Sequence, residues 1–517
     1  MRSTKLICLL MVLCLVCSMF LVACGEEEVS SVPETSGTNE AKAITSGTFY
    51  DGDTLTVLVC GVNTTYTSEI VPADTSEETD EVYPTVLNDA LREREIILEE
   101  QLGLTIEEIY IEDGARKNAL MATAVRNMNM IASNEYHIVV PCLYDGATLA
   151  SEGELYNLYA LNGENDMPVL QINEEWWNQE FNKEMTIGDQ LYFTIGDLGL
   201  INKSSTAALF FNYDLWYQMG LNTEQYYGAD PYQLVRDYKW TLDLVTEVSM
   251  LKSKDLNNDN VIDYSDEFGW SGQLDDMWSI FYGSGERIAK AGSDGFPEIT
   301  IYNERSSGLM DKLQEFVQND ECYISANDYF GVAGVKWPAE LTRAAFTEGR
   351  CMFYNGNVGT VMELEDMEAH FGIVPVPIYD DTQDHYNSLV NAWTSTCFAI
   401  PSTLSGDELV KACDALNVLG WASKHAENNV ANAYYEIVIK YQKVRDEESV
   451  EMVDEYIFPN RGCDIGMVYA WGGLDLLLHN MASKSVGTFA SSYESLKNVA
   501  NTALELTIDY FKEVAGE

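Results

Sequence analysis

The residues with the clearest coordination chemistry form an acidic loop between positions 255 and 266. This loop reads DLNNDNVIDYSD and carries oxygen-bearing side chains at alternate positions. Oxygen ligands at positions 1, 3, 5, 9 and 12, with a backbone carbonyl at position 7, are typical of a calcium-binding loop. The sequence therefore predicts a structural Ca²⁺ site whose ligands are Asp255, Asn257, Asp259, Val261 (through its carbonyl), Asp263 and Asp266.

Two positions of this loop depart from the calcium-loop template. Asn260 stands where the template has Gly, although Asn tolerates the positive φ that such a turn requires. Asp266 stands where the template has Glu, which shortens the reach for bidentate ligation. A solvated turn rich in Asp and Asn would have the same composition, and it remains the alternative.

The chain as a whole is strongly acidic. Its 517 residues include 83 Asp and Glu against 30 Lys and Arg, which gives a formal net charge of −53. Such a surface repels phosphate backbones, so it argues against nucleic acid as a partner. The chain is also longer than one hydrophobic core usually serves, so we expect two or more domains.

The cysteines do not form a disulfide or zinc-ligand pattern. Of eleven Cys, four lie in the N-terminal segment, and the other seven are scattered, mostly within apolar runs. We expect those seven to be buried free thiols.

The N-terminus has the features of an export signal. Arg2 and Lys5 precede a nearly continuous apolar run from Leu6 to Val22. The run ends in LVACG (Leu21–Gly25), which resembles the lipobox of bacterial lipoproteins, where the Cys is lipidated. A diacylglycerol on that Cys plus an N-acyl chain would give a stable membrane anchor. An ordinary signal peptide, or a single span with a chance Cys, is the alternative.

This pattern divides the N-terminal region into two segments. We expect a lipoprotein signal peptide at 1–23, and a flexible tether at 24–52 that begins with the lipidated Cys24. The tether follows from the Ser, Thr, Glu and Gly content of residues 26–47, which show no periodicity. The mature protein would then lie on the extracellular face of the bacterial cell membrane.

The first part of the body alternates strand and helix patterns. Apolar runs predict strands at 54–60, 104–111 and 137–143, and helical spacing predicts helices at 87–102 and 117–132. This order implies a parallel sheet covered on both faces, with ligands beyond the carboxyl ends of the strands. The residues expected there are Asn63, Thr64, Tyr144 and Asp145, of which Asp145 is the strongest polar candidate.

The rest of the chain mixes both patterns. Strands are predicted at 190–195, 298–302, 351–354, 371–377 and 397–401, and helices at 309–317 and 341–348. Ser405 and Glu408 are spaced as a capping box for a helix that continues through Leu419. From residue 423 the chain is expected to be mostly helical, with a loop at 459–473.

Five blocks, in order along the chain, resemble the bacterial extracellular solute-binding proteins of the maltose-binding-protein type. They are ALFFNYDLWYQMGL (Ala208–Leu221), the helix and acidic loop KWTLDLVTEVSMLKSKDLNNDNVIDYSDEFGW (Lys239–Trp270), AFTEGRCMFYNGNVG (Ala345–Gly359), FGIVPVPIY (Phe371–Tyr379) and the helix from Asp407. Members of this family are substrate-binding lipoproteins of ABC importers.

The resemblance implies an α/β, two-lobe, periplasmic-binding-protein-like fold with a ligand cleft between the lobes. Lobe one would comprise residues 53–207 and 378–436, and lobe two residues 208–377 and 437–517. Many sugar-binding members place a Trp shortly after the Asn-Gly of the third block, but Val358 stands at that position here. Other aromatic residues could replace that platform: Trp176, Trp177, Trp270, Trp278, Trp393 and Trp471. Asn355, in the third block, is a further candidate ligand-binding residue. The resemblance also implies that the acidic loop aims Trp270 toward the cleft.

The functional expectation is capture of a sugar or oligosaccharide and its delivery to an ABC transporter permease, by a protein expected to be monomeric. The chain contains no G-x-S-x-G, H-E-x-x-H, phosphate-binding Gly loop or dinucleotide fingerprint, so we do not expect an enzyme. A surface glycosidase remains an alternative, because 83 acidic residues offer many carboxylate pairs. An adhesin without a transported ligand is the third possibility.

Overall fold

The structure is a computed structural model, and it describes residues 42–60, 70–72, 85–111, 119–332, 339–364, 366–436, 446–482 and 487–516. Residues 43–517 form one compact unit. Within the described residues, no helix is long and apolar enough to cross a membrane. Cys24 lies outside the described residues, as do the signal peptide and most of the predicted tether.

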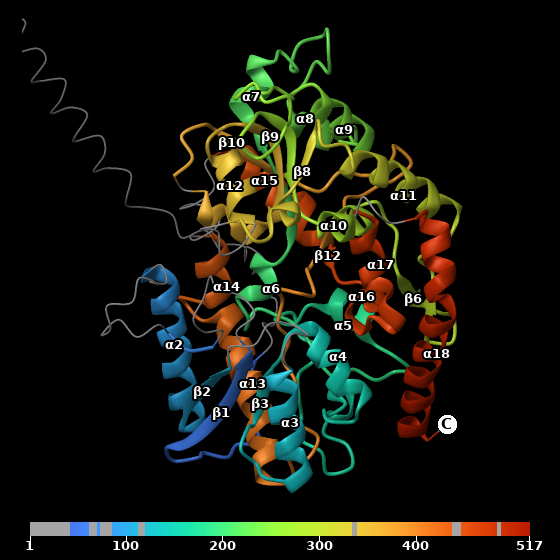
Figure 1. Cartoon of the computed structure of the whole chain (residues 1–517). Helices are drawn as coiled ribbons and strands as arrows, with labels where there is room; N and C mark the ends of the chain where they lie inside the picture. The colour runs from blue at the N-terminus through green and yellow to red at the C-terminus, as the bar shows by residue number, and fades with distance from the viewer. Residues whose placement is uncertain are drawn as a thin grey trace, which may run out of the picture. The chain divides into compact units, whose positions relative to one another are not determined.

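The first sheet is parallel, as the alternating pattern predicts. Its strand order is β2-β1-β3. The elements are β1 (Asp53–Cys60), α2 (Thr85–Leu102), β2 (Leu104–Ile111), α3 (Leu120–Ile131), β3 (Ile138–Val140) and α4 (Leu143–Ser151). The right-handed crossover rule places α2 and α3 on opposite faces of this sheet. Figure 1 shows α2 and α3 beside these strands, together with α13 (Asp407–His425), which contacts α2.

The second sheet is mixed and has the order β10-β4-β9-β5-β8. Its strands are β4 (Ala207–Asn212), β5 (Phe268–Gly272), β8 (Tyr323–Ser325), β9 (Cys351–Asn357) and β10 (Phe371–Val374). Strand β4 is antiparallel to both β9 and β10, whereas β5 is parallel to β9 and β8. The helices of this region include α7 (Tyr213–Gln218), α8 (Pro231–Arg236), α9 (Leu242–Met250), α10 (Asp276–Gly283), α11 (Glu304–Val317) and α12 (Ala339–Thr347).

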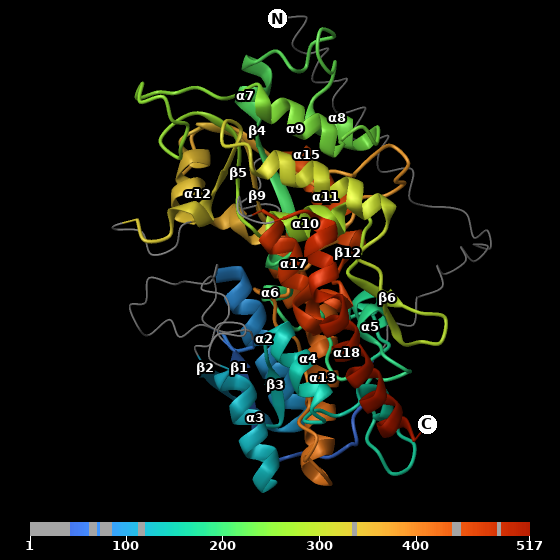
Figure 2. The ribbon, with the colours of Figure 1, turned by 45° about the vertical axis from the view of Figure 1, so that its right-hand side comes forward.

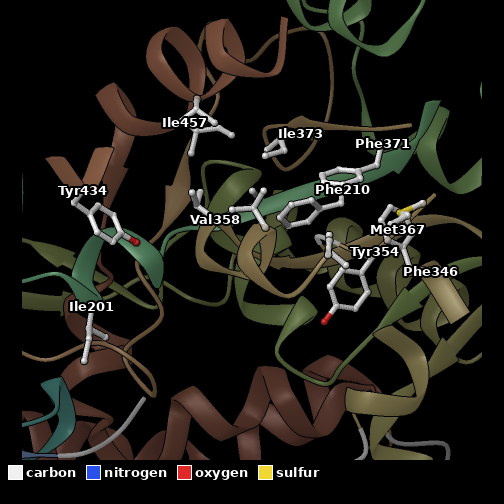
Figure 3. Close-up of a cluster of buried hydrophobic side chains, with 14 of the residues drawn as sticks. Ile201, Phe210, Phe346, Tyr354, Val358, Met367, Phe371, Ile373, Tyr434 and Ile457 are labelled. Carbon is white, nitrogen blue, oxygen red and sulfur yellow. The ribbon is translucent and has the colours of Figure 1, made fainter. Parts of the chain in front are cut away.

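A large apolar core is built on this sheet. Figure 3 shows Phe210 of β4, Tyr354 of β9 and Phe371 of β10 packed with Phe346 of α12, all of them buried. The rings of Phe346 and Tyr354 are stacked with their centroids 5.7 Å apart. The alternate apolar residues of β4, β9 and β10 fit this arrangement, because one face of each strand points into the core.

Three stretches that are far apart in the sequence hydrogen-bond to one another. They are residues 205–207, residues 388–391, which include β11 (Ser388–Leu389), and β12 (Arg461–Gly462). Residues 388–391 pair with both of the other stretches. The Val390 N–H donates to the Gly462 carbonyl at 2.8 Å, and the Asn391 N–H donates to the Ser205 carbonyl at 2.9 Å. The lobe boundaries predicted at 207/208, 377/378 and 436/437 stay a prediction.

The C-terminal part is helical. It contains α15 (Glu447–Glu451), α16 (Ile465–Tyr469), α17 (Leu474–Met481) and the long α18 (Phe489–Ala515). Figure 2 shows α17 and α18 side by side, and the two helices contact each other. The loop predicted at 459–473 therefore includes a short helix, α16.

Two local predictions were wrong. Helix α13 begins at Asp407 with Gly406 as its N-cap, at φ 56°, and no side chain caps it. Glu408 instead contacts His137 and Lys411, so the predicted capping box with Ser405 does not form. The segments 190–195 and 397–401 are not continuous strands, because they pair only through isolated bridges such as that between Thr194 and Phe398. The seven cysteines of the body are all buried and free, as predicted.

The core of the second sheet provides a stability test. Replacing Phe210 with Ala removes a fully buried ring, so we expect the free energy of unfolding to fall by about 3–5 kcal/mol. The matched control is Leu506→Ala, because Leu506 is 67% exposed on α18 and its change should stay within about 0.5 kcal/mol. Urea unfolding followed by circular dichroism measures both. Equal costs for the two variants would contradict the packing described here.

Candidate functional site

Three of the predicted ligand-binding residues meet in one place. Trp393 follows β11 and is 39% exposed, which makes it the most exposed of the tryptophans that the structure describes. Trp393 makes an edge-to-face contact with Tyr144, in which the ring centroids are 6.1 Å apart and the ring planes meet at 75°. Tyr144 also brings α4 to α17, since its hydroxyl lies 3.5 Å from Oδ2 of Asp475.

The third residue, Trp278 of α10, is buried against α17. Its indole N–H donates to the Asp475 carbonyl at 2.7 Å, and its ring stacks on His479 with centroids 4.7 Å apart. Trp278 is 2% exposed, so it supports the His479 ring from the buried side. A ligand would therefore meet the side chains around Trp278 before it met the Trp278 ring itself.

A chain of polar contacts links these helices to Trp393. The His479 Nε2 lies 3.0 Å from Oδ1 of Asp275, and the amide of Asn391 donates to the other oxygen of Asp275 at 3.2 Å. The Asn391 Oδ1 accepts the backbone N–H of Trp393 at 2.8 Å. We call this set the Trp393 cluster, and its members are Tyr144, Asp275, Trp278, Asn391, Trp393, Asp475 and His479.

Sequence reasoning missed four members of the cluster: Asp275, Asn391, Asp475 and His479. One signal was available, because Asp475 and His479 are four residues apart and so share a face of α17. Asp275 and Asn391 come from distant parts of the chain, and no spacing in the sequence connects them.

The predicted residue Asp145 lies next to the cluster residue Tyr144. Helix α4 begins at Leu143, so Tyr144 and Asp145 belong to its first turn. Asp145 is buried, at 4% exposure. A carboxylate in this position stabilises the helix N-terminus. Asn63 and Thr64, predicted beyond β1, lie outside the described residues.

Asn355 and Trp270 belong to a buried network around Asp276 instead of the Trp393 cluster. The Asp276 carboxylate accepts hydrogen bonds from the Trp270 indole (2.8 Å), the Tyr323 hydroxyl (2.9 Å) and the Asn355 amide (2.8 Å). Trp270 is fully buried, so the expectation that it points toward a ligand is not supported by its position. The network fixes the first turn of α10, and α10 carries Trp278.

Burial is the main cause of an unusual titration in this network. It raises the pKa of Asp276 to about 7, although the donors from Asn355, Trp270 and Tyr323 favour the ionised form and pull in the other direction. The carboxyl group is therefore partly protonated near neutral pH.

The two remaining tryptophans among the predicted ligand-binding residues, Trp177 and Trp471, are packed elsewhere. Trp177 is buried against Phe398, with ring centroids 6.2 Å apart. Trp471 is buried too, and its indole N–H donates to the Thr507 hydroxyl of α18 at 2.9 Å. A shallow groove of about 350 Å³ runs past Trp471 between α4 and α18, but the ring itself is 3% exposed.

The acidic loop is a tight turn held by its own hydrogen bonds. Asp255 accepts the backbone N–H groups of Asn258 (2.6 Å) and Asn260 (2.8 Å), and the buried Asp266 accepts those of Leu256 and Asp263. Asn260 has φ 67°, the conformation for which the calcium-loop template uses Gly. Yet nowhere in the described residues do three His, Cys, Asp or Glu side chains gather as a metal site. The Ca²⁺ site at this loop stays a prediction.

Comparison with known proteins gives a likeness of structure only. No family model matches the sequence, and no curated protein matches it. Many solved structures do match. The ABC substrate-binding protein Lmo0181 from Listeria monocytogenes, in complex with cycloalternan, is 13% identical with a TM-score of 0.52, and the match covers 87% of this chain and 99% of that one.

Two further structures give the same result. MalE3 from T. maritima, with maltose bound, is 12% identical with a TM-score of 0.51, covering 88% of this chain and 100% of that one. A solute-binding protein from Agrobacterium radiobacter K84, in complex with ribitol, is 10% identical with a TM-score of 0.52 and the same coverage. The chain therefore has the two-lobe α/β fold of solute-binding proteins of the maltose-binding type.

The Asp276 network predicts a pH dependence of stability. The folded pKa of about 7 lies above the ordinary carboxyl pKa of 3.8, so the folded state holds the proton more tightly than the unfolded state does. Between pH 4 and 7 this group therefore lowers the free energy of unfolding as pH rises, with a limiting slope of about 1.4 kcal/mol per pH unit.

The variant Asp276→Asn removes this titration. Relative to the parent protein, the variant should gain stability steadily from pH 4 to pH 7, measured by urea unfolding at several pH values. The trend identifies the group even if the substitution changes stability by a constant amount. Parallel curves for the two proteins would show that Asp276 is not the titrating group.

Proposed function

We propose that this protein is a membrane-anchored extracellular solute-binding protein that captures a sugar or oligosaccharide and delivers it to an ABC transporter permease. The observation that carries the proposal is the half-exposed Trp393 beside Tyr144, with the polar side chains of Asn391, Asp275 and His479 adjoining it. An aromatic face packs on the C–H face of a sugar ring, while carboxylate and amide groups bind its hydroxyls. The fold supports the same proposal, since the compared structures hold cycloalternan, maltose and ribitol.

The proposed mechanism is ligand-dependent closure. The Trp393 cluster combines residues of α4, α10, α17 and the segment after β11, so one ligand would contact several elements together. A ligand that makes more contacts in the closed state shifts the population toward that state. The closed, monomeric protein would then dock on the permease, held at the membrane by the lipid on Cys24.

Binding without turnover separates this proposal from the glycosidase alternative. The compared structures are those of binding proteins, which favours the solute-binding proposal. The mature protein is incubated with a panel of mono- and oligosaccharides. A rise in melting temperature with at least one sugar, and no product by chromatography, is expected. Released product would support a glycosidase, and no shift with any sugar would favour an adhesin.

The contribution of Trp393 can be measured with the sugar that gives the largest shift. Trp393→Ala removes the exposed aromatic face, so the affinity measured by isothermal titration calorimetry should fall about tenfold or more, which corresponds to about 1.4 kcal/mol or more. Trp421→Ala is the matched control, because Trp421 lies on α13 beside His425 and has no described contact with the Trp393 cluster. Equal affinities for the two variants would remove Trp393 from the site.

We also propose that the acidic loop binds Ca²⁺ and that the metal has a structural role. The turn with Asn260 at positive φ supports this, although the side chains would have to rearrange to converge on an ion. Chelation by EDTA should lower the melting temperature of protein purified with calcium, while sugar affinity changes little. Adding back Ca²⁺, but not Mg²⁺, should restore it. If EDTA leaves the melting temperature unchanged, the loop is a solvated turn.

A further inference from the structure

A group of cations, of which Lys203 is buried and the others are partly buried, lies at β12. The Lys203 ammonium is 2.7 Å from one carboxylate oxygen of Asp197, and the Lys424 ammonium is 3.3 Å from the other. Lys203 comes from α6 (Ile201–Ser204) and Lys424 from the last turn of α13. Burial opposes ionisation of Asp197, but the two lysines outweigh it, so the pKa of this carboxyl stays below its usual value. Both oxygens of Asp197 are thus already engaged by cations.

Arg461 of β12 adds a third positive charge to this group. It is close enough to Lys203 and Asp197 to affect both titrations, and desolvation by burial lowers the pKa of Arg461 and of Lys203. The Arg461 Nη1 is enclosed, and no residue among those that the structure describes forms a hydrogen bond with it. Within the described part of the chain no carboxylate forms a salt bridge with Arg461, and its guanidinium lies 5.0 Å from the centroid of the Phe458 ring.

This charge balance is unusual for such an acidic protein. Two lysines pair with the single carboxylate of Asp197 and Arg461 lies near them, although Asp and Glu greatly outnumber Lys and Arg in the chain as a whole. A fourth cation, Arg94, lies at the same turn, since it donates to the Leu198 carbonyl at 3.0 Å and to the Ser423 hydroxyl at 2.9 Å. A buried charge that is left unpaired is costly, and a guanidinium fork matches the geometry of an oxyanion.

We propose that Arg461, Lys203 and Lys424 bind a small inorganic oxyanion of the phosphate or sulfate class. Asp197 holds the two ammonium groups in place, and the unpartnered Nη1 of Arg461 supplies a hydrogen bond to the anion. The three cations come from α6, α13 and β12, so the anion cross-links elements that are far apart in the sequence. Because β12 is hydrogen-bonded to β11, the anion stabilises the segment that leads to Trp393.

The test is the thermal unfolding of the purified chain in sodium phosphate and in sodium chloride at equal ionic strength. Equal ionic strength is needed because salt screens the repulsion among the many acidic groups. Phosphate should raise the melting temperature saturably beyond chloride in the parent protein. The rise should disappear in Arg461→Gln. The control Lys312→Gln should keep it, because Lys312 pairs with Asp243 at the surface.

Isothermal titration calorimetry with inorganic phosphate gives an independent readout. The parent protein should bind phosphate, and Lys424→Gln should bind it more weakly, because the substitution removes one of the three positive charges. Lys424 is partly exposed at the rim of the group, so this variant should still fold. If Arg461→Gln does not fold, these two titrations decide the question in its place. The proposal is overturned if the parent protein shows no saturable binding, or if Arg461→Gln or Lys424→Gln responds to phosphate as the parent does.

Discussion

The hydrogen bonds that join residues 205–207, 388–391 and 461–462 are the constraint on which the candidate site depends. The chain reaches this place three times, at the start of β4, at β11 and at β12. Each of these segments is short, so the bonds between them determine where the residues that follow can lie. The position of Asn391, and through it that of Trp393, is set by this pairing.

The Trp393 cluster illustrates how buried groups position exposed ones. Asp276, which is fully buried, fixes the first turn of α10 through Trp270, Tyr323 and Asn355. Trp278, one helical turn of α10 beyond Asp275, then braces His479, and His479 in turn contacts Asp275. The exposed aromatic surface is provided by Trp393, whereas most of the other tryptophans serve the core. On the side of the helices the site is supported by side chains that are buried, those of Asp276 and Trp278.

The sequence predicted the elements far better than the site. The apolar strands and the helical spacing of α2 and α3 are local patterns, so β1, β2 and β3 and their parallel order could be predicted. Tyr144 was predicted from its place after the third strand, and Trp278 and Trp393 as possible replacements for a stacking tryptophan. The structure brings the three together, and their role in binding a ligand stays a proposal. The buried positions of Trp177, Trp270 and Trp471 could not be predicted, because a tryptophan has the same sequence signal in a core as in a binding site. Asp275 and Asn391 could not be predicted either, since their contact depends on the tertiary pairing of distant segments.

The central claim is that a sugar closes this protein around the Trp393 cluster without being cleaved. The most direct measurement is small-angle X-ray scattering of the mature protein, with and without a saturating amount of the sugar that stabilises it most. The account predicts a smaller radius of gyration with the sugar, and the same sugar recovered intact from the sample. An unchanged radius of gyration at saturation, or a cleaved sugar, would contradict it.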